Sequence, residues 1–175
     1  ANLLPKILNV EVMSRFRGRM LEFSPGVKFR EFGERNLFLA RGSSRDYGGE
    51  EINNIAERLG FEIVFPEKLS IHEQISTFSQ ARRIAGPMGS AFANILFSGP
   101  ETKALILAPS YPPLIEDWWA SFAEISGTQL SVFRGKQEAT QPYKLCQEEV
   151  EDVLSSFGYS VDHVGSLRRA AADLP

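Results

Sequence analysis

Cysteine and histidine are scarce in this sequence: its 175 residues include a single cysteine, Cys146, and two histidines, His72 and His163. One cysteine cannot form an internal disulfide framework or a cysteine-rich zinc site. The histidines stand in no Ser–His–Asp arrangement that the sequence shows, and in no His-Glu-x-x-His metal pair. We therefore interpret Cys146 as an inert thiol, and we expect neither a bound metal nor an organic cofactor.

Long apolar runs are also absent. No stretch approaches the roughly 18 apolar residues that a membrane helix needs, and no basic-then-apolar segment opens the chain. The sequence thus predicts a cytoplasmic protein without a transmembrane segment. With 14 glycines and 10 prolines, the chain has too few of either for a collagen-like or low-complexity protein. Its length is that of one globular domain.

Positive charge is concentrated at the start of the chain. Residues 1–45 contain nine Lys and Arg against four Asp and Glu, whereas the whole chain has a net charge of -3. This basic part can face an anionic ligand, or it can be a solvated helix face that carries arginines. The overall acidity and the lack of an arginine-rich tract argue against nucleic acid as a partner.

Short apolar runs alternate with helical patterns along the chain. The runs predict strands at residues 36–41, 61–65, 82–86, 103–108 and 128–134, and the patterns predict helices at residues 50–59, 70–80, 90–97, 117–126 and 148–157. Strands that alternate with such helices form parallel sheets covered on both faces. The sequence therefore predicts an α/β fold with a Rossmann-like, doubly wound sheet of about five mostly parallel strands.

The chain divides into a helical segment at residues 1–30, a Rossmann-like domain at residues 31–165 and a tail at residues 166–175. An arginine-rich helix in the first segment is expected to pack on the sheet or on a neighbour outside this sequence. Within the domain, Ser70 is a predicted N-cap that forms a capping box with Glu73.

The first predicted strand is followed by Arg41-Gly-Ser-Ser-Arg45. In doubly wound sheets, ligands bind at the carboxyl ends of the strands, near the point where the strand order reverses. Guanidinium groups form paired hydrogen bonds with phosphate, and small residues let a ligand approach the backbone. The turn therefore suits a diphosphate, although a surface turn with two solvated arginines explains the same residues.

The third predicted strand ends in the turn Gly86-Pro-Met88-Gly89-Ser90, which opens directly into the helix that carries Asn94. The first N–H groups of a helix are unpaired and lie at the positive end of its dipole, so they attract anions. Ser90 can cap this helix and also face a ligand. The alternative is a capped core helix whose glycines allow tight packing.

The second predicted strand leads through Pro66, Lys68 and Leu69 into the helix that carries Gln74. A nucleotide base or ribose often lies at this position in doubly wound sheets. Lys68 or the backbone of Leu69 can contact it there. An ordinary connection between a strand and a helix explains these residues equally well.

Six segments between about residues 36 and 110 carry a resemblance to a known family. They are Phe38-Leu-Ala-Arg41, Leu59-Gly-Phe61-Glu-Ile-Val, Pro66-Glu-Lys-Leu-Ser70, Phe78-Ser-Gln-Ala81, Gly86-Pro-Met-Gly89-Ser-Ala91 and Asn94-Ile-Leu-Phe97. Their order and spacing resemble the carboxyl-terminal half of glycosyltransferase family 61, whose members are often described as capsular polysaccharide biosynthesis proteins. The ordered set is more specific than any one segment.

This resemblance implies a GT-B architecture, in which the segment is the Rossmann-like domain that binds a nucleotide sugar. The implied activity is transfer of a sugar from a nucleoside diphosphate sugar, by family analogy a UDP-sugar, to a glycan acceptor in capsular or exopolysaccharide biosynthesis. Such enzymes typically need no bound metal. An amino-terminal acceptor domain is then expected outside this sequence.

By position, Arg41, Arg45, Gln74, Gly86, Gly89, Ser90, Ala91 and Asn94 match residues of the family. With the strand-end argument, this assigns diphosphate binding to Arg41, Arg45, Gly86, Met88, Gly89, Ser90 and Asn94, and base or ribose binding to Pro66, Lys68, Leu69 and Gln74. Met88 replaces the histidine usual in the family's turn, and a thioether neither donates a strong hydrogen bond nor carries a proton. A second hypothesis is therefore a non-catalytic α/β module that binds a nucleotide or anion and needs a partner domain. The catalytic residues stay unidentified.

Overall fold

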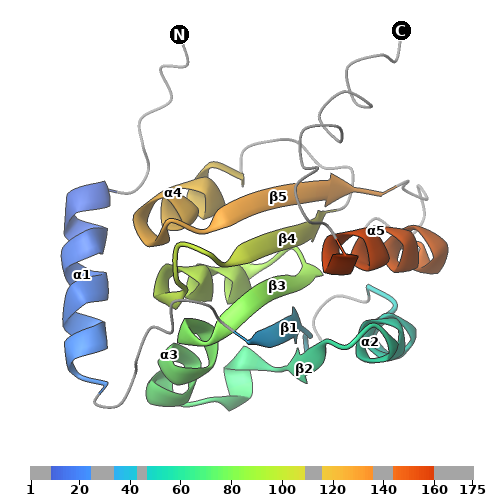
Figure 1. Cartoon of the computed structure of the whole chain (residues 1–175), viewed down its shortest axis with the longest axis horizontal. Helices are drawn as coiled ribbons and strands as arrows, with labels where there is room; N and C mark the ends of the chain where they lie inside the picture. Colours follow the sequence, from blue (N-terminus) through green and yellow to red (C-terminus); the bar gives the residue numbers. More distant parts are fainter. Residues whose placement is uncertain (1–8, 25–33, 43–46, 109–115, 136–143, 160–175) are drawn as a thin grey trace, which may run out of the picture.

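A five-stranded parallel sheet forms the centre of the molecule (Figure 1). The computed structural model describes residues 9–24, 34–42, 47–108, 116–135 and 144–159. The strands are β1 (Arg35–Leu39), β2 (Glu62–Val64), β3 (Ala81–Pro87), β4 (Lys103–Ala108) and β5 (Gln129–Arg134), in the order β2-β1-β3-β4-β5. All four neighbouring pairs are parallel. The predicted α/β Rossmann-like sheet is confirmed, and its strand order reverses between β1 and β3.

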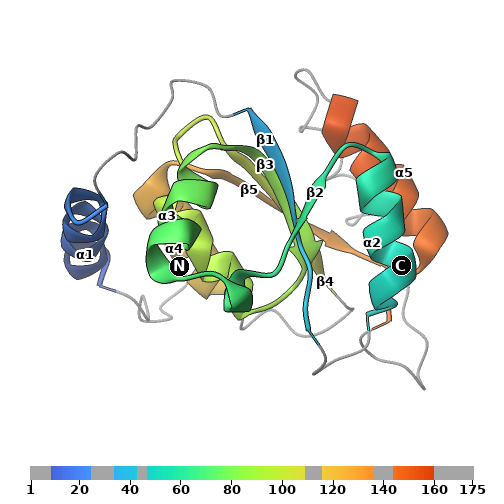
Figure 2. The same cartoon turned by 90° about the horizontal axis from the view of Figure 1, so that it is seen from below.

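Helices cover both faces of this sheet (Figure 2). One face carries α2 (Gly49–Arg58) and α5 (Gln147–Tyr159), and the other carries α3 (Ile71–Ser79), the 3₁₀-helix η2 (Ser90–Phe97) and α4 (Glu116–Ser126). A short 3₁₀ turn, η1 (Pro66–Lys68), joins β2 to α3. The predicted tail at residues 166–175 lies outside the described residues.

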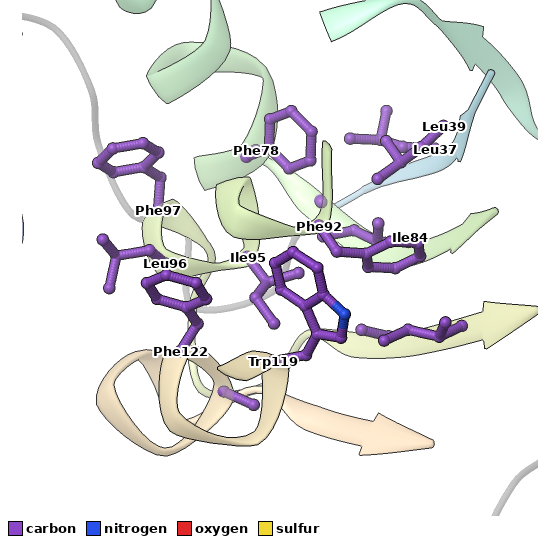
Figure 3. Packing of buried hydrophobic residues seen from close by; sticks show 14 of the residues in the cluster. Leu37, Leu39, Phe78, Ile84, Phe92, Ile95, Leu96, Phe97, Trp119 and Phe122 are labelled. Carbon is purple, nitrogen blue, oxygen red and sulfur yellow. The ribbon is translucent and has the colours of Figure 1, made fainter. Parts of the chain in front are cut away.

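Alternate residues of the strands enter two separate cores. Leu37 and Leu39 of β1 belong to the cluster beneath α3, η2 and α4, whereas Phe38 belongs to the cluster beneath α2 and α5. Figure 3 shows the first cluster, where Phe78 of α3 and Phe92 of η2 are fully buried over the sheet. Because successive strand residues point to opposite faces, a continuous apolar run is what a doubly covered strand requires.

The arginine-rich helix α1 (Val10–Glu22) packs on the helical layer rather than on the sheet itself (Figure 2). Arg17 donates through Nε to the Leu96 carbonyl at 2.7 Å and through Nη2 to the Ser98 carbonyl at 3.0 Å. Burial lowers the pKa of Arg17. A cation at the carboxyl end of a helix also opposes the negative end of its dipole. Part of the basic charge at the start of the chain therefore holds α1 against η2.

The predicted capping box at the start of α3 is confirmed. The Glu73 amide donates to Ser70 Oγ at 3.3 Å, and the Ser70 amide donates to Glu73 Oε2 at 2.7 Å. The hydrogen bonds with Ser70 lower the pKa of Glu73. The stabilisation of the folded protein by the ionised Glu73 is therefore present at neutral pH. It is lost as the pH falls through the lowered pKa of Glu73.

Replacing Ser70 with alanine should destabilise the protein by about 1 kcal/mol, because the Glu73 amide at the start of α3 loses its side-chain partner. Urea unfolding at pH 7 measures the change. Ser14→Ala is the control, since Ser14 is exposed within α1 and has no capping role. Equal stability of S70A and S14A would show that the box contributes nothing.

Candidate functional site

The ends of β1 and β3 bring Arg41 and Gly89 together. A methyl group built at Gly89 would overlap Arg41 Nη2 and lie 2.6 Å from its Cζ and 2.9 Å from its Nε. The guanidinium therefore lies across the glycine turn, at the point where the strand order reverses. Sequence analysis placed both residues at this edge from the rule for parallel strands, and the structure puts them in direct contact.

The two glycines of the turn are needed for different reasons. The backbone of Gly89 is extended, with φ 177 and ψ 176, so any residue can adopt it, but a side chain there would displace Arg41. Gly86 has φ 157, and a Cβ there would lie 2.7 Å from the Leu39 carbonyl oxygen and 3.0 Å from the Leu39 Cβ. Gly86 thus lets the backbones of β3 and β1 pass closely, whereas Gly89 makes room for a guanidinium.

The helix that follows begins differently from the expectation. Gly89, not Ser90, is its N-cap residue, and no side chain caps it. Ser90 is exposed in the first turn, and the Phe92 amide closes that turn on the Gly89 carbonyl at 3.0 Å. The amides of Ser90 and Ala91 therefore have no partner within the helix, which is the arrangement that accepts an anion.

Asn94 and Met88 both make contacts within the protein. Asn94 is 8% exposed and donates through Nδ2 to the Ala91 carbonyl at 3.2 Å. The Met88 amide donates to the Leu107 carbonyl at 2.9 Å, and its half-buried side chain packs against the core. Both residues hold the turn and its helix in place, and a ligand contact by either stays a prediction.

Gln74 fixes the connection after β2. Its Nε2 donates to the Pro66 carbonyl and to the Leu69 carbonyl, each at 3.0 Å. Both amide hydrogens are thereby used within the protein. Lys68 lies exposed, with Nζ 4.2 Å from the centre of the Phe65 ring. The predicted base or ribose contacts stay predictions, and Gln74 is seen to hold the loop after β2 together.

Sequence analysis missed Tyr47, which is 3% exposed beside the end of β1. Its hydroxyl donates to Asn53 Oδ1 at 2.9 Å and accepts from the Arg41 amide at 3.4 Å. Burial raises the pKa of Tyr47, so the hydroxyl stays protonated at neutral pH. Tyr47 thus ties the backbone of Arg41 to α2. No local pattern signals this, because the contact joins a loop to a helix side chain.

Glu67 was also missed, although it lies within the predicted loop. Its Oε1 accepts a hydrogen bond from the Gly42 amide at 3.0 Å. The side chain is exposed at the same edge of the sheet, where β2 ends beside β1. The signal that could have found it is its place directly after the second strand, where doubly wound sheets often carry an acidic residue.

Other predicted residues lie elsewhere or beyond the described part of the chain. Arg45 falls within residues 43–46, which lie outside it. His72 is exposed, and its Nδ1 is 3.2 Å from Ser24 Oγ. Among the described residues, no group of three or more His, Cys, Asp and Glu side chains is placed to hold a metal ion.

None of the described helices is both long and apolar enough to cross a membrane.

An open groove of about 530 Å³ lies between α4 and the edge strand β5. Its lining residues are Ala120, Ala123, Glu124, Gly127, Thr128, Leu130 and Val132. The groove is separate from the site at β1 and β3, because β4 stands between β3 and β5.

Comparison with known families completes the description of the site. The model of the family described as Glycosyltransferase 61 matches residues 8–105, which is more than half of the chain and includes both strand ends that meet at Arg41 and Gly89. A search among curated proteins found no match. The family resemblance inferred from the order of the segments is confirmed, and the chain belongs to the glycosyltransferase 61 family.

Proposed function

We propose that this chain binds the donor of a glycosyl transfer, a nucleoside diphosphate sugar, at the switch point between β1 and β3. The observation that carries the proposal is the contact of the Arg41 guanidinium with the Gly89 turn. Membership of the family supports glycosyl transfer as the activity. We further propose a UDP-sugar as the donor and a glycan of capsular or exopolysaccharide biosynthesis as the acceptor.

Stabilisation of the departing diphosphate is the chemistry that these residues can supply. When the bond between the sugar and the β-phosphate breaks, negative charge grows on the phosphate oxygens. The Arg41 guanidinium and the amides of Ser90 and Ala91 are preorganised donors for such charge. Tyr47 bonds the backbone amide of Arg41 and so fixes the point of the chain from which the guanidinium reaches the turn. The base that activates the acceptor is proposed to come from an acceptor domain outside this sequence.

A second candidate is a module that binds the nucleotide without transferring sugar. Met88 favours it, because the turn carries a half-buried thioether that can neither donate a proton nor accept one. The two candidates share the diphosphate site and differ only in turnover. Incubation with a UDP-sugar in the presence of the proposed acceptor domain, followed by detection of free UDP, separates them: release supports transfer chemistry, and binding without release supports the module.

Calorimetric titration tests the proposed function directly. UDP, UDP-glucose and GDP are titrated into the protein at low salt and again at higher salt. We expect a saturable heat with at least one of them and weaker binding at higher salt, because a charged contact with phosphate is screened. No heat from any of the three at millimolar concentration would remove the proposal.

The variant Gly89→Ala should weaken UDP binding about tenfold while leaving the fold stable. The new methyl group displaces the Arg41 guanidinium, which is the far end of a flexible side chain and can move at little cost. Calorimetry measures the affinity, and a thermal melt measures stability. Gly18→Ala in α1 is the matched control, since a Cβ there meets nothing within 4 Å. Unchanged UDP affinity in G89A would show that the position of Arg41 is unimportant.

A further inference from the structure

Glu67 is held at the ligand edge of the sheet by the backbone of β1. The residue sits in the 3₁₀ turn after β2, and its Oε1 accepts from the Gly42 amide at 3.0 Å. Gly42 directly follows Arg41, so the carboxylate and the guanidinium are attached to neighbouring points of the same edge. The two hydrogen bonds from Gln74 to Pro66 and Leu69 fix the turn that carries Glu67.

The second carboxylate oxygen of Glu67 is available for a ligand. The side chain is exposed, and within the described residues the only hydrogen bond to it is the one from Gly42. An ionised carboxylate accepts hydrogen bonds and cannot donate them. It also repels phosphate. A nucleotide that places its diphosphate on Arg41 would therefore present hydroxyl groups, not phosphate, to Glu67.

The strand order brings the turn that carries this oxygen next to the proposed diphosphate site. The proposed diphosphate site lies between β1 and β3, and β2 is the neighbour of β1 on its other side. Adjacent strands are about 4.8 Å apart, and the ribose is joined to the diphosphate through its 5′ oxygen. A nucleotide that extends from Arg41 toward β2 thus brings its 2′ and 3′ hydroxyls over η1.

We propose that Glu67 binds the ribose hydroxyls of the nucleotide donor and makes the site selective for ribonucleotides over their deoxy analogues. This inference rests on the proposed function, because it assumes that the diphosphate binds at Arg41. It assigns recognition of the ribose to Glu67, whereas the other residues of the proposed site bind the phosphates.

Calorimetry with UDP, 2′-deoxy-UDP and 3′-deoxy-UDP tests the proposal. The wild-type protein should bind UDP about tenfold more tightly than at least one deoxy analogue, the effect of a hydrogen bond to a charged group. In Glu67→Gln, which keeps an oxygen for the Gly42 amide, this ratio should fall to about threefold or less. Glu67→Asp, which withdraws the carboxylate, should lower it as well. Glu57→Gln, an exposed change on α2, should leave the ratio unchanged.

The outcomes separate this inference from the proposed function. If the wild type binds none of the three nucleotides, the proposed function fails and takes the inference with it. If UDP binds but the wild type does not discriminate, or if E67Q and E67D discriminate as well as the wild type, only the inference is overturned. A role limited to holding Gly42 would change the affinity for all three nucleotides equally and would leave the ratio untouched.

Discussion

Replacing Gly86 with alanine is expected to destabilise the protein by about 3 kcal/mol. The new Cβ would lie 2.7 Å from the Leu39 carbonyl oxygen, and the φ of 157° is one that alanine rarely adopts. Neither conflict can be relieved by moving a flexible side chain, because the nearest atom belongs to the backbone of β1. Overpacking and backbone strain of this kind each cost about 1–3 kcal/mol. Urea unfolding followed by circular dichroism measures the change.

Gly89→Ala provides the comparison for this prediction. Both variants add one methyl group to the same turn, but at Gly89 the methyl meets the end of the Arg41 side chain. G86A should therefore lose stability, whereas G89A should lose ligand affinity and keep its stability. A loss below about 1 kcal/mol in G86A would contradict the close approach of β1 and β3 at this point.

The variant Arg41→Ala should weaken UDP binding by about 1.5–3 kcal/mol, the range for a hydrogen bond to a charged group. This corresponds to a roughly 10- to 150-fold increase in Kd. The fold should survive, because Tyr47 bonds the backbone amide of residue 41 and not its side chain. Arg41→Lys should recover part of the affinity, since an ammonium keeps the charge but cannot form the paired hydrogen bonds of a guanidinium.

Arg15→Ala is the control for the loss of one positive charge. Arg15 is exposed on α1, and its ion-pair partner among the described residues is Glu11 of the same helix. Its removal should change the UDP affinity by less than about twofold once salt screens long-range charge. Equal affinities of R41A, R15A and wild type would mean that the diphosphate does not bind at Arg41.

Local signals predicted the elements of this fold well. The capping residue Ser70, the apolar runs and the alternation of strands with helices are properties of neighbouring residues, and each was found in the structure. The meeting of Arg41 with the glycine turn also followed from the sequence, because parallel strands bring their carboxyl ends to one edge. The rule for parallel strands predicts which edge of the sheet holds these residues, and the glycines of the turn indicate where another group comes close to the backbone.

Contacts that depend on the tertiary structure could not be predicted in the same way. The bond of Tyr47 with the Arg41 amide and that of Glu67 with the Gly42 amide depend on how loops settle on the sheet. The same holds for Arg17, whose carbonyl partners lie some 80 residues further along the chain. The helix at residues 90–97 was predicted correctly, but Ser90 as its cap was wrong, because Ser90 is the first residue of η2 and Gly89 is the N-cap, with no side-chain hydrogen bond.

Amide chemical shifts measured during titration with UDP test the central claim most directly. The account predicts that the largest changes occur at Gly42, Gly89, Ser90 and Ala91, around the Arg41 guanidinium. Gly127 and Leu130, in the groove between α4 and β5, should serve as unaffected references. Changes confined to that groove, with the amides around Arg41 unmoved at saturation, would contradict the account.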